Sequence, residues 1–291
     1  MSDKIAANRL VAYAGMRELT AKDGIKEAFN SARVCSYEGV ELLYIASECA
    51  LLKKQTQEIK TAIKESGLGV KCISCFTDIV GARAPYAPDQ NAIGVVKNCI
   101  DLAVSIGSPY VHHTLVTRLS GGRDDYQEAL VTVLDVAGDI ADYASERGVS
   151  ILYEPQGMLF NGLDGYSEFF DAMLERHGNV GVCLDVGNTL WVDEDCYAVA
   201  EKYASHVKHV HLKDYVLDSD DNRYRTMAGR TIEEVGLGKG IIDLDRVLAI
   251  LNGVGYRGYY SIEDNSGTDF KTTAENAHNV LKELRIFLKS F

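Results

Sequence analysis

Short apolar runs rich in β-branched residues alternate along the whole chain with longer amphipathic stretches. The runs predict eight strands, over residues 9–15, 39–46, 69–77, 109–116, 149–155, 180–187, 207–214 and 258–264. The longer stretches predict helices over residues 23–36, 48–66, 89–106, 122–147, 167–177, 195–205, 243–252 and 271–289. Glycines just before several strands, as in ESGLGV, SIGS and RGVS, are typical of helix ends.

Eight strands that each lead into a helix favour an α/β fold, a single parallel (β/α)8 barrel. A doubly wound open sheet is the rival, but the turn after the first strand, AYAGMREL, lacks the G-x-G-x-x-G spacing of a phosphate-binding turn. Only four prolines occur and no linker interrupts the pattern, so we expect one domain over residues 1–291. The longest irregular piece, 216–240, follows the seventh strand, on the face where barrel active sites lie.

Charge and cysteine content exclude several classes of protein. The formal net charge is −12 and no run of five like charges occurs, which argues against nucleic-acid partners. No apolar run has the length of a signal peptide or a membrane span, so we expect a cytoplasmic protein without membrane contacts, and a homo-oligomer is compatible with the sequence. The seven cysteines are scattered, as reduced buried thiols are, and a strand would send Cys72 and Cys75 to opposite faces.

Four polar residues stand near the carboxyl ends of consecutive predicted strands: Glu154 in ILYEPQG, Asp185 in VCLDVGN, His211 in HVHLKD and Glu263 in YSIEDN. Each alone could be a solvated strand end or a turn cap. Three carboxylates that converge at one rim would repel one another and lose hydration, and a divalent cation removes that conflict. The oxygen-rich set with one imidazole favours Mn²⁺, with Mg²⁺, Co²⁺ and Zn²⁺ as alternatives. We expect His209 one layer deeper, behind the ligand or in the core.

The segments EPQG, LDVGN, HVHLKD, VGLGKGIID and IED, in this order and at these separations, resemble the xylose isomerase-like TIM barrel superfamily of sugar and sugar-phosphate isomerases and epimerases. The resemblance covers essentially the whole chain and implies one divalent metal bound by Glu154, Asp185, His211 and Glu263. It also implies that Glu154 and Glu263 are the catalytic acid–base pair. The expected activity is a metal-dependent isomerase or epimerase that moves a proton next to the carbonyl of a small carbohydrate, through a metal-stabilised enediolate.

Two departures from the family leave other outcomes open. Ketose 3-epimerases usually carry a histidine where this chain has Asn188, and an arginine in the loop after strand seven that has no clear match in this chain. The same metal site also serves lyases, so a ketosugar lyase similar to inosose dehydratases or C-glycoside-cleaving enzymes is the alternative, as is a non-catalytic sugar-binding barrel. The endonuclease branch carries a further histidine before the turn that reads VGLGKG, and this chain lacks it.

Four further residues are candidates for substrate binding: His113, Asn188, Trp191 and Lys213. Alternation lets only one of His112 and His113 face inward, and the family resemblance favours His113. Trp191 suits the apolar face of a sugar but equally a packing role, and Lys213 suits a carbonyl or phosphate but equally a neighbouring charge. The glycine-rich turn around Lys239 offers backbone amides that could receive a phosphate.

Overall fold

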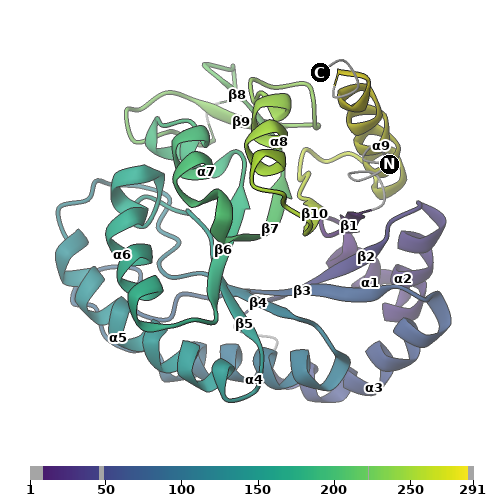
Figure 1. The fold of residues 1–291 in the computed structure, drawn as a ribbon, viewed down its shortest axis with the longest axis horizontal. Helices are drawn as coiled ribbons and strands as arrows, with labels where there is room; N and C mark the ends of the chain where they lie inside the picture. Colours follow the sequence, from purple (N-terminus) through teal and green to yellow (C-terminus); the bar gives the residue numbers. More distant parts are fainter. Residues whose placement is uncertain (1–8, 46–48, 222, 288–291) are drawn as a thin grey trace.

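A computed structural model describes residues 9–45, 49–221 and 223–287 and shows a closed barrel of eight parallel strands surrounded by helices (Figure 1). The strand order around the barrel is β1-β10-β7-β6-β5-β4-β3-β2. The strands are β1 Leu10–Ala12, β2 Gly39–Ile45, β3 Gly69–Phe76, β4 Tyr110–His113, β5 Ser150–Tyr153, β6 Val180–Asp185, β7 Val207–Leu212 and β10 Tyr259–Ile262. The predicted (β/α)8 barrel is thus confirmed.

The helices lie outside the strands and cover them (Figure 1). They are α1 Met16–Asp23, α2 Ile25–Val34, α3 Cys49–Ser66, α4 Gln90–Ile106, α5 Tyr126–Ser145, α6 Gly162–Arg176, α7 Tyr197–Tyr203, α8 Leu244–Gly253 and α9 Phe270–Phe287, with short 3₁₀ helices η3 Asn188–Val192 and η4 Ala204–His206. Among the described residues, no helix has the length and apolar character needed to cross a membrane.

Three predicted helices differ from the structure, and one of them, 122–147, begins four residues later than predicted, at Tyr126. The first predicted helix, 23–36, is preceded by α1, and the two are separated by Gly24, whose φ of 86° an L-residue rarely adopts. The hydrophobic pattern missed α1 because Met16 is its one buried residue. Helix α6 begins five residues earlier than the predicted 167, where the Asn161 side chain accepts a hydrogen bond from the Gly162 amide. The last two residues of predicted helix 271–289 lie outside the described part.

Side chains of the strands alternate between two apolar layers. The outward set packs against the helices in the main core, and a smaller inward set contains Cys72, Leu152 and Cys183. Cys75 belongs to the outward set, so the two cysteines of the C-x-x-C pair lie on opposite faces of β3, as expected. The six cysteines whose side chains are described are all free thiols.

The pairing of β2 with β3 contains one irregularity. Val40 lies opposite Val70, whereas the next residue, Glu41, lies opposite Cys72. Lys71 is therefore left without a partner in this ladder, which is the pattern of a β-bulge. Beyond the bulge the pairing is regular as far as the end of both strands.

The segment 216–240, expected to be irregular, contains part of an antiparallel hairpin made of β8 Asp214–Leu217 and β9 Ile232–Val235. It stands above the barrel next to the end of β7 (Figure 1). A satellite apolar cluster supports it, and this cluster includes Trp191, Met158 and Ile232. Trp191 is only 9% exposed and its indole Nε1 lies 3.5 Å from the Tyr215 hydroxyl. The tryptophan therefore packs beneath the hairpin.

The base of the hairpin is held by Asp214, which is completely buried. Its carboxylate accepts hydrogen bonds from four backbone amides, those of Tyr215 (3.0 Å), Gly238 (3.0 Å), Gly240 (2.8 Å) and Ile242 (3.1 Å). Two amides of the glycine-rich turn around Lys239, those of Gly238 and Gly240, are thus bound to a carboxylate of the same chain, and the Lys239 amide donates to the Gly236 carbonyl oxygen. The idea that this turn receives a phosphate is therefore wrong.

We expect Gly240→Ala to destabilise the protein. A Cβ at this position would overlap both the Asp214 carboxylate and the carbonyl oxygen of Tyr215, and such overpacking costs about 1–3 kcal/mol. Gly94→Ala, in the middle of α4 where a Cβ meets no described atom within 4 Å, should instead stabilise by about 0.5–1 kcal/mol. Urea unfolding measures the free energy of unfolding of both variants. Equal midpoints for the two would contradict the close packing of Gly240 against Asp214.

Candidate metal centre

The structure brings together the four residues predicted to bind a metal. Asp185 ends β6 and His211 lies in β7, while Glu154 and Glu263 directly follow β5 and β10. One ligand atom from each lies within 4.8 Å of the others. His211 Nδ1 is 2.8 Å from Glu154 Oε1 and 3.0 Å from Glu263 Oε2. All are buried except Glu263, whose side chain is 18% exposed.

The charges of this cluster fit a divalent cation. Lys213 is buried beside it, and its Nζ lies 3.0 Å from both Asp185 Oδ2 and Glu263 Oε1. When all three carboxylates are ionised, one ammonium group offsets only part of their charge, which burial has removed from water. Three carboxylates and one imidazole are also a donor set that suits Mn²⁺, Mg²⁺ or Zn²⁺. These residues therefore fit one divalent ion held by Glu154, Asp185, His211 and Glu263.

The pKa values of the cluster show how strongly the groups interact before an ion is bound. Burial raises the pKa of Glu154 to about 7 despite the opposing charge of His211. Burial also acts on Glu263, but Lys213 and His211 outweigh it and hold the pKa of that carboxyl at about 2. Burial would lower the pKa of His211, yet Cys183 and the surrounding carboxylates raise it well above its usual value. The metal-free centre therefore retains protons on Glu154 and His211 near neutral pH.

We expect the affinity for a divalent ion to rise with pH. The ion binds the ionised carboxylate and the neutral imidazole, so it must displace the protons of Glu154 and His211. Below pH 7 the carboxyl of Glu154 is protonated, so the affinity should fall about tenfold per pH unit for each proton released. Titration with Mn²⁺ at several pH values between 5.5 and 7.5 measures this dependence. A dissociation constant that does not change over this range would show that Glu154 and His211 carry no proton in the metal-free protein.

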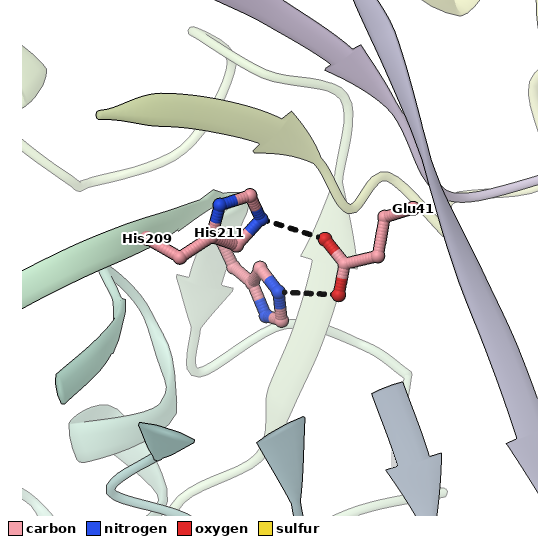
Figure 2. Close-up of side chains that lie close together, drawn as sticks. All are labelled: Glu41, His209 and His211. Carbon is pink, nitrogen blue, oxygen red and sulfur yellow. Dashed lines mark hydrogen bonds and ion pairs between the residues drawn. The ribbon is translucent and has the colours of Figure 1, made fainter. Parts of the chain in front are cut away.

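A fourth acidic residue, which the sequence pattern did not single out, lies beneath the cluster. Glu41 of β2 is fully buried, and one oxygen of its carboxylate faces the ring of His209 while the other faces the ring of His211 (Figure 2). The distances are 2.8 Å from Oε2 to His209 Nε2 and 3.1 Å from Oε1 to His211 Nε2. His209 thus lies one layer deeper than His211, as expected. The signal that could have identified Glu41 is a lone acid in a strand that a parallel barrel buries on both faces.

The structure corrects the choice between the two histidines of β4. His112 faces the centre, with Nδ1 3.0 Å from Ser74 Oγ and Nε2 3.6 Å from Glu154 Oε2. His113 points to the opposite face, where Nδ1 lies 2.9 Å from the Thr114 carbonyl oxygen and the ring edge packs on Tyr153. The expectation that His113 faces the substrate is therefore wrong, because alternation along the strand places His112 there.

The other predicted substrate residues divide into two groups. Asn188 and Lys213 lie beside the cluster: the backbone N–H of Asn188 donates to Asp185 Oδ1 at 2.7 Å, and the Asn188 side-chain oxygen is 3.4 Å from Lys213 Nζ. Trp191, by contrast, packs beneath the hairpin, in the apolar cluster that includes Tyr215. A contact between substrate and Asn188 or Lys213 stays a prediction.

A cavity of about 270 Å³ reaches the cluster. Glu154, Glu263, His112 and Gln156 form part of its lining, and Tyr13, Leu43 and Phe76 supply aromatic and aliphatic surface. The Tyr13 ring stacks on the His211 ring with centroids 5.0 Å apart, which fixes the imidazole from above. The size and the mixed lining suit a small molecule with both polar and apolar faces.

Comparison with known proteins decides the family. Residues 29–290 match the family described as xylose isomerase-like TIM barrel. The chain belongs to this family. It is 27% identical over 138 residues to inosose dehydratase of Geobacillus thermodenitrificans, a match that covers 45% of each protein. The chain thus spans about half the length of the curated relatives it matches.

Solved structures share the fold of this family member at low sequence identity. D-Allulose 3-epimerase from Methylomonas sp. superposes with a TM-score of 0.72 at 16% identity, over 98% of this chain and 100% of the epimerase. A xylose isomerase-like TIM barrel protein from Mycobacterium smegmatis, solved in complex with magnesium, gives 0.70 at 17% identity, over 96% and 98% of the two chains. At these identities the likeness establishes the fold alone.

Proposed function

We propose that this chain is a divalent-metal-dependent isomerase or epimerase of a small carbohydrate, a sugar or sugar phosphate, which moves a proton next to a carbonyl group. The observation that carries the proposal is the pair of carboxylates Glu154 and Glu263. Both approach His211 Nδ1 within 3.0 Å, and both line the cavity. They come from β5 and β10, which are separated in the barrel by β6 and β7, so they approach the cavity from different sides.

Each residue has a separate task in this reaction. Glu154, Asp185, His211 and Glu263 would hold a divalent ion, which would supply positive charge near the substrate oxygen while the neighbouring carbon loses its proton. One of the two glutamates removes that proton and the other delivers a proton on the opposite side of the carbon. Lys213, 3.0 Å from Glu263, holds that carboxylate in a fixed orientation. We favour Mn²⁺, and the magnesium complex of the Mycobacterium smegmatis relative makes Mg²⁺ the first alternative.

Proton NMR in deuterated water tests this function on a panel of ketoses and aldoses. Isomerisation or epimerisation should replace the hydrogen next to the carbonyl with deuterium and leave the number of oxygens unchanged. A metal-loaded chain that exchanges no such hydrogen in any sugar of the panel would refute the proposal.

A second candidate is the elimination of water from a cyclic or open-chain ketosugar. The sequence match to inosose dehydratase favours it, and so does Asn188 at the position where ketose 3-epimerases usually carry histidine. The first step is the same, because a glutamate takes the proton next to the carbonyl. The bond to the hydroxyl on the adjacent carbon then breaks, and the second carboxyl protonates the departing oxygen to give water. A product lighter by one water, seen by mass spectrometry, distinguishes this outcome from isomerisation.

A further inference from the structure

Glu41 stands at the centre of a buried hydrogen-bond network below the candidate metal centre (Figure 2). Its Oε1 contacts His211 Nε2 at 3.1 Å and Ser74 Oγ at 2.5 Å. Its Oε2 contacts His209 Nε2 at 2.8 Å and also accepts from the Ser261 hydroxyl. The two oxygens therefore meet four polar groups, contributed by three other strands of the barrel.

The hydrogen bonds to Glu41 determine which ring nitrogen of His211 carries the hydrogen. The two serine hydroxyls donate to the carboxylate, and an ionised carboxylate can only accept. A ring nitrogen that faces it is therefore an N–H donor, which places the hydrogen of His211 on Nε2. The other nitrogen, Nδ1, is the one that faces Glu154 and Glu263. A neutral His211 held in this way presents its lone pair to the position of the ion.

The same network extends to His112 through Ser74. The single hydrogen of the Ser74 hydroxyl goes to Glu41, so toward His112 the serine oxygen accepts, and His112 Nδ1 carries the hydrogen of that 3.0 Å contact. A neutral His112 then has its lone pair on Nε2. Within the described chain this buried nitrogen has no hydrogen-bond partner, and His112 lines the cavity. An unpartnered buried acceptor at a cavity suits a ligand hydroxyl.

We propose that Glu41 is a positioning residue that fixes the hydrogen positions of two imidazoles, so that His211 offers Nδ1 to a divalent ion and His112 offers Nε2 to a hydroxyl of the substrate. The inference rests on the proposed function for the identity of these two ligands. Glu41 contacts neither of them and acts through the histidines.

A rival role for Glu41 is that of a metal ligand. Glu41, His209 and His211 lie close enough together to hold an ion of their own, which would give two ions per chain. The four contacts of the Glu41 carboxylate argue against this, because both oxygens already receive hydrogen bonds. His211 Nε2 also lies 3.4 Å from Cys183 Sγ, which is farther than the Glu41 oxygen, so Glu41 is the nearer acceptor for this nitrogen.

Zinc titration against a chromophoric chelator tests the link to His211. We expect one zinc per wild-type chain and an affinity about 10–100-fold lower for Glu41→Gln, because an amide offers one accepting oxygen and one donating nitrogen to four groups that need acceptors. Ser261→Ala is the matched control, since it removes one contact of Glu41 but leaves the contacts to His211 and Ser74. Its zinc affinity should stay close to that of the wild type.

Nitrogen-15 NMR of the histidine rings tests the hydrogen positions in the wild-type chain, and so decides the proposal even if Glu41→Gln does not fold. In the zinc-loaded protein His211 should carry its hydrogen on Nε2. In both the metal-free and the zinc-loaded protein, His112 should carry its hydrogen on Nδ1. In Ser74→Ala the hydrogen of His112 should no longer be confined to Nδ1, and the zinc affinity should be unchanged.

Three results would overturn the proposal: a Glu41→Gln variant that binds zinc as tightly as the wild type, two zinc ions per wild-type chain, or a His112 hydrogen on Nε2. The proposed function fails separately. A chain that binds zinc and shows both expected ring forms, but alters no sugar, would refute the isomerase or lyase and support Glu41 as a positioning residue. A chain that binds no divalent ion would refute the metal-dependent function and overturn the role of Glu41 toward His211.

Discussion

Glu154→Gln and Glu263→Gln should each lower kcat by about 10²–10⁴-fold and leave the barrel folded, because an amide cannot take up or deliver a proton at the substrate carbon. The amide keeps the shape of the side chain and one oxygen that can bind an ion. Exchange of the hydrogen next to the carbonyl, followed by NMR in deuterated water, measures the proton-transfer step directly. Circular dichroism of both variants reports whether the fold is kept.

The control for this experiment is Glu201→Gln, which removes an exposed carboxylate of α7 paired with Arg246 at 3.2 Å. This variant should exchange hydrogen at the wild-type rate, since exposed pairs contribute little. A second measurement at saturating Mn²⁺ separates proton transfer from metal binding. If excess Mn²⁺ returns Glu154→Gln or Glu263→Gln to the wild-type rate, that residue serves only as a ligand and its assignment as acid or base is refuted.

Lys213→Met should destabilise the metal-free protein by about 3–5 kcal/mol, because it removes the buried ammonium group that lies 3.0 Å from Asp185 and Glu263 and leaves two buried carboxylates without it. For a chain of this size the melting temperature should fall by about 10 °C. Addition of Mn²⁺ should recover a large part of the loss, since the ion supplies the missing positive charge. Thermal unfolding with and without Mn²⁺ measures both effects.

Lys202→Met provides the comparison. This lysine forms an ion pair of similar length, 2.8 Å to Asp171, but both partners are exposed, so the loss should be about 1 kcal/mol or less and independent of Mn²⁺. A deficit in Lys213→Met that is the same with and without Mn²⁺ would show that the lysine and the ion do not share the charge of the cluster.

The sequence predicted the barrel well because its strands are buried on both faces. Such strands form continuous apolar runs that differ clearly from the amphipathic helices between them. The elements that it missed bury little apolar surface of their own. In helix α1 only Met16 is buried and Leu19 is partly buried against the core, and β9, with the sequence IEEV, is half polar and pairs with residues 15 to 21 positions earlier. Pairing of that kind leaves no periodic signal in a single sequence.

The candidate site was predictable only where strand ends converge. Glu154, Asp185, His211 and Glu263 stand at corresponding ends of neighbouring strands, so the parallel topology alone brings them together. The choice between adjacent side chains of one strand depends on register, which the sequence does not reveal. The sequence could therefore not decide between His112 and His113, and the structure shows that His112 faces the cavity.

The β-bulge between β2 and β3 determines which one-residue deletions in β3 the network below the metal centre would tolerate. Lys71 is the additional residue there, and its Nζ lies 4.5 Å from the centre of the Tyr259 ring. A deletion of this one codon would leave Val70 next to Cys72 and keep the present pairs Val40–Val70 and Glu41–Cys72, so Ser74 would stay on its side of the strand, whereas deletion of Ile73 would turn Ser74 to the opposite face. Loss of the bulge lysine would thus leave His112 connected to Glu41 through Ser74, and loss of a residue beyond the bulge would break that connection without altering Glu41 or His112.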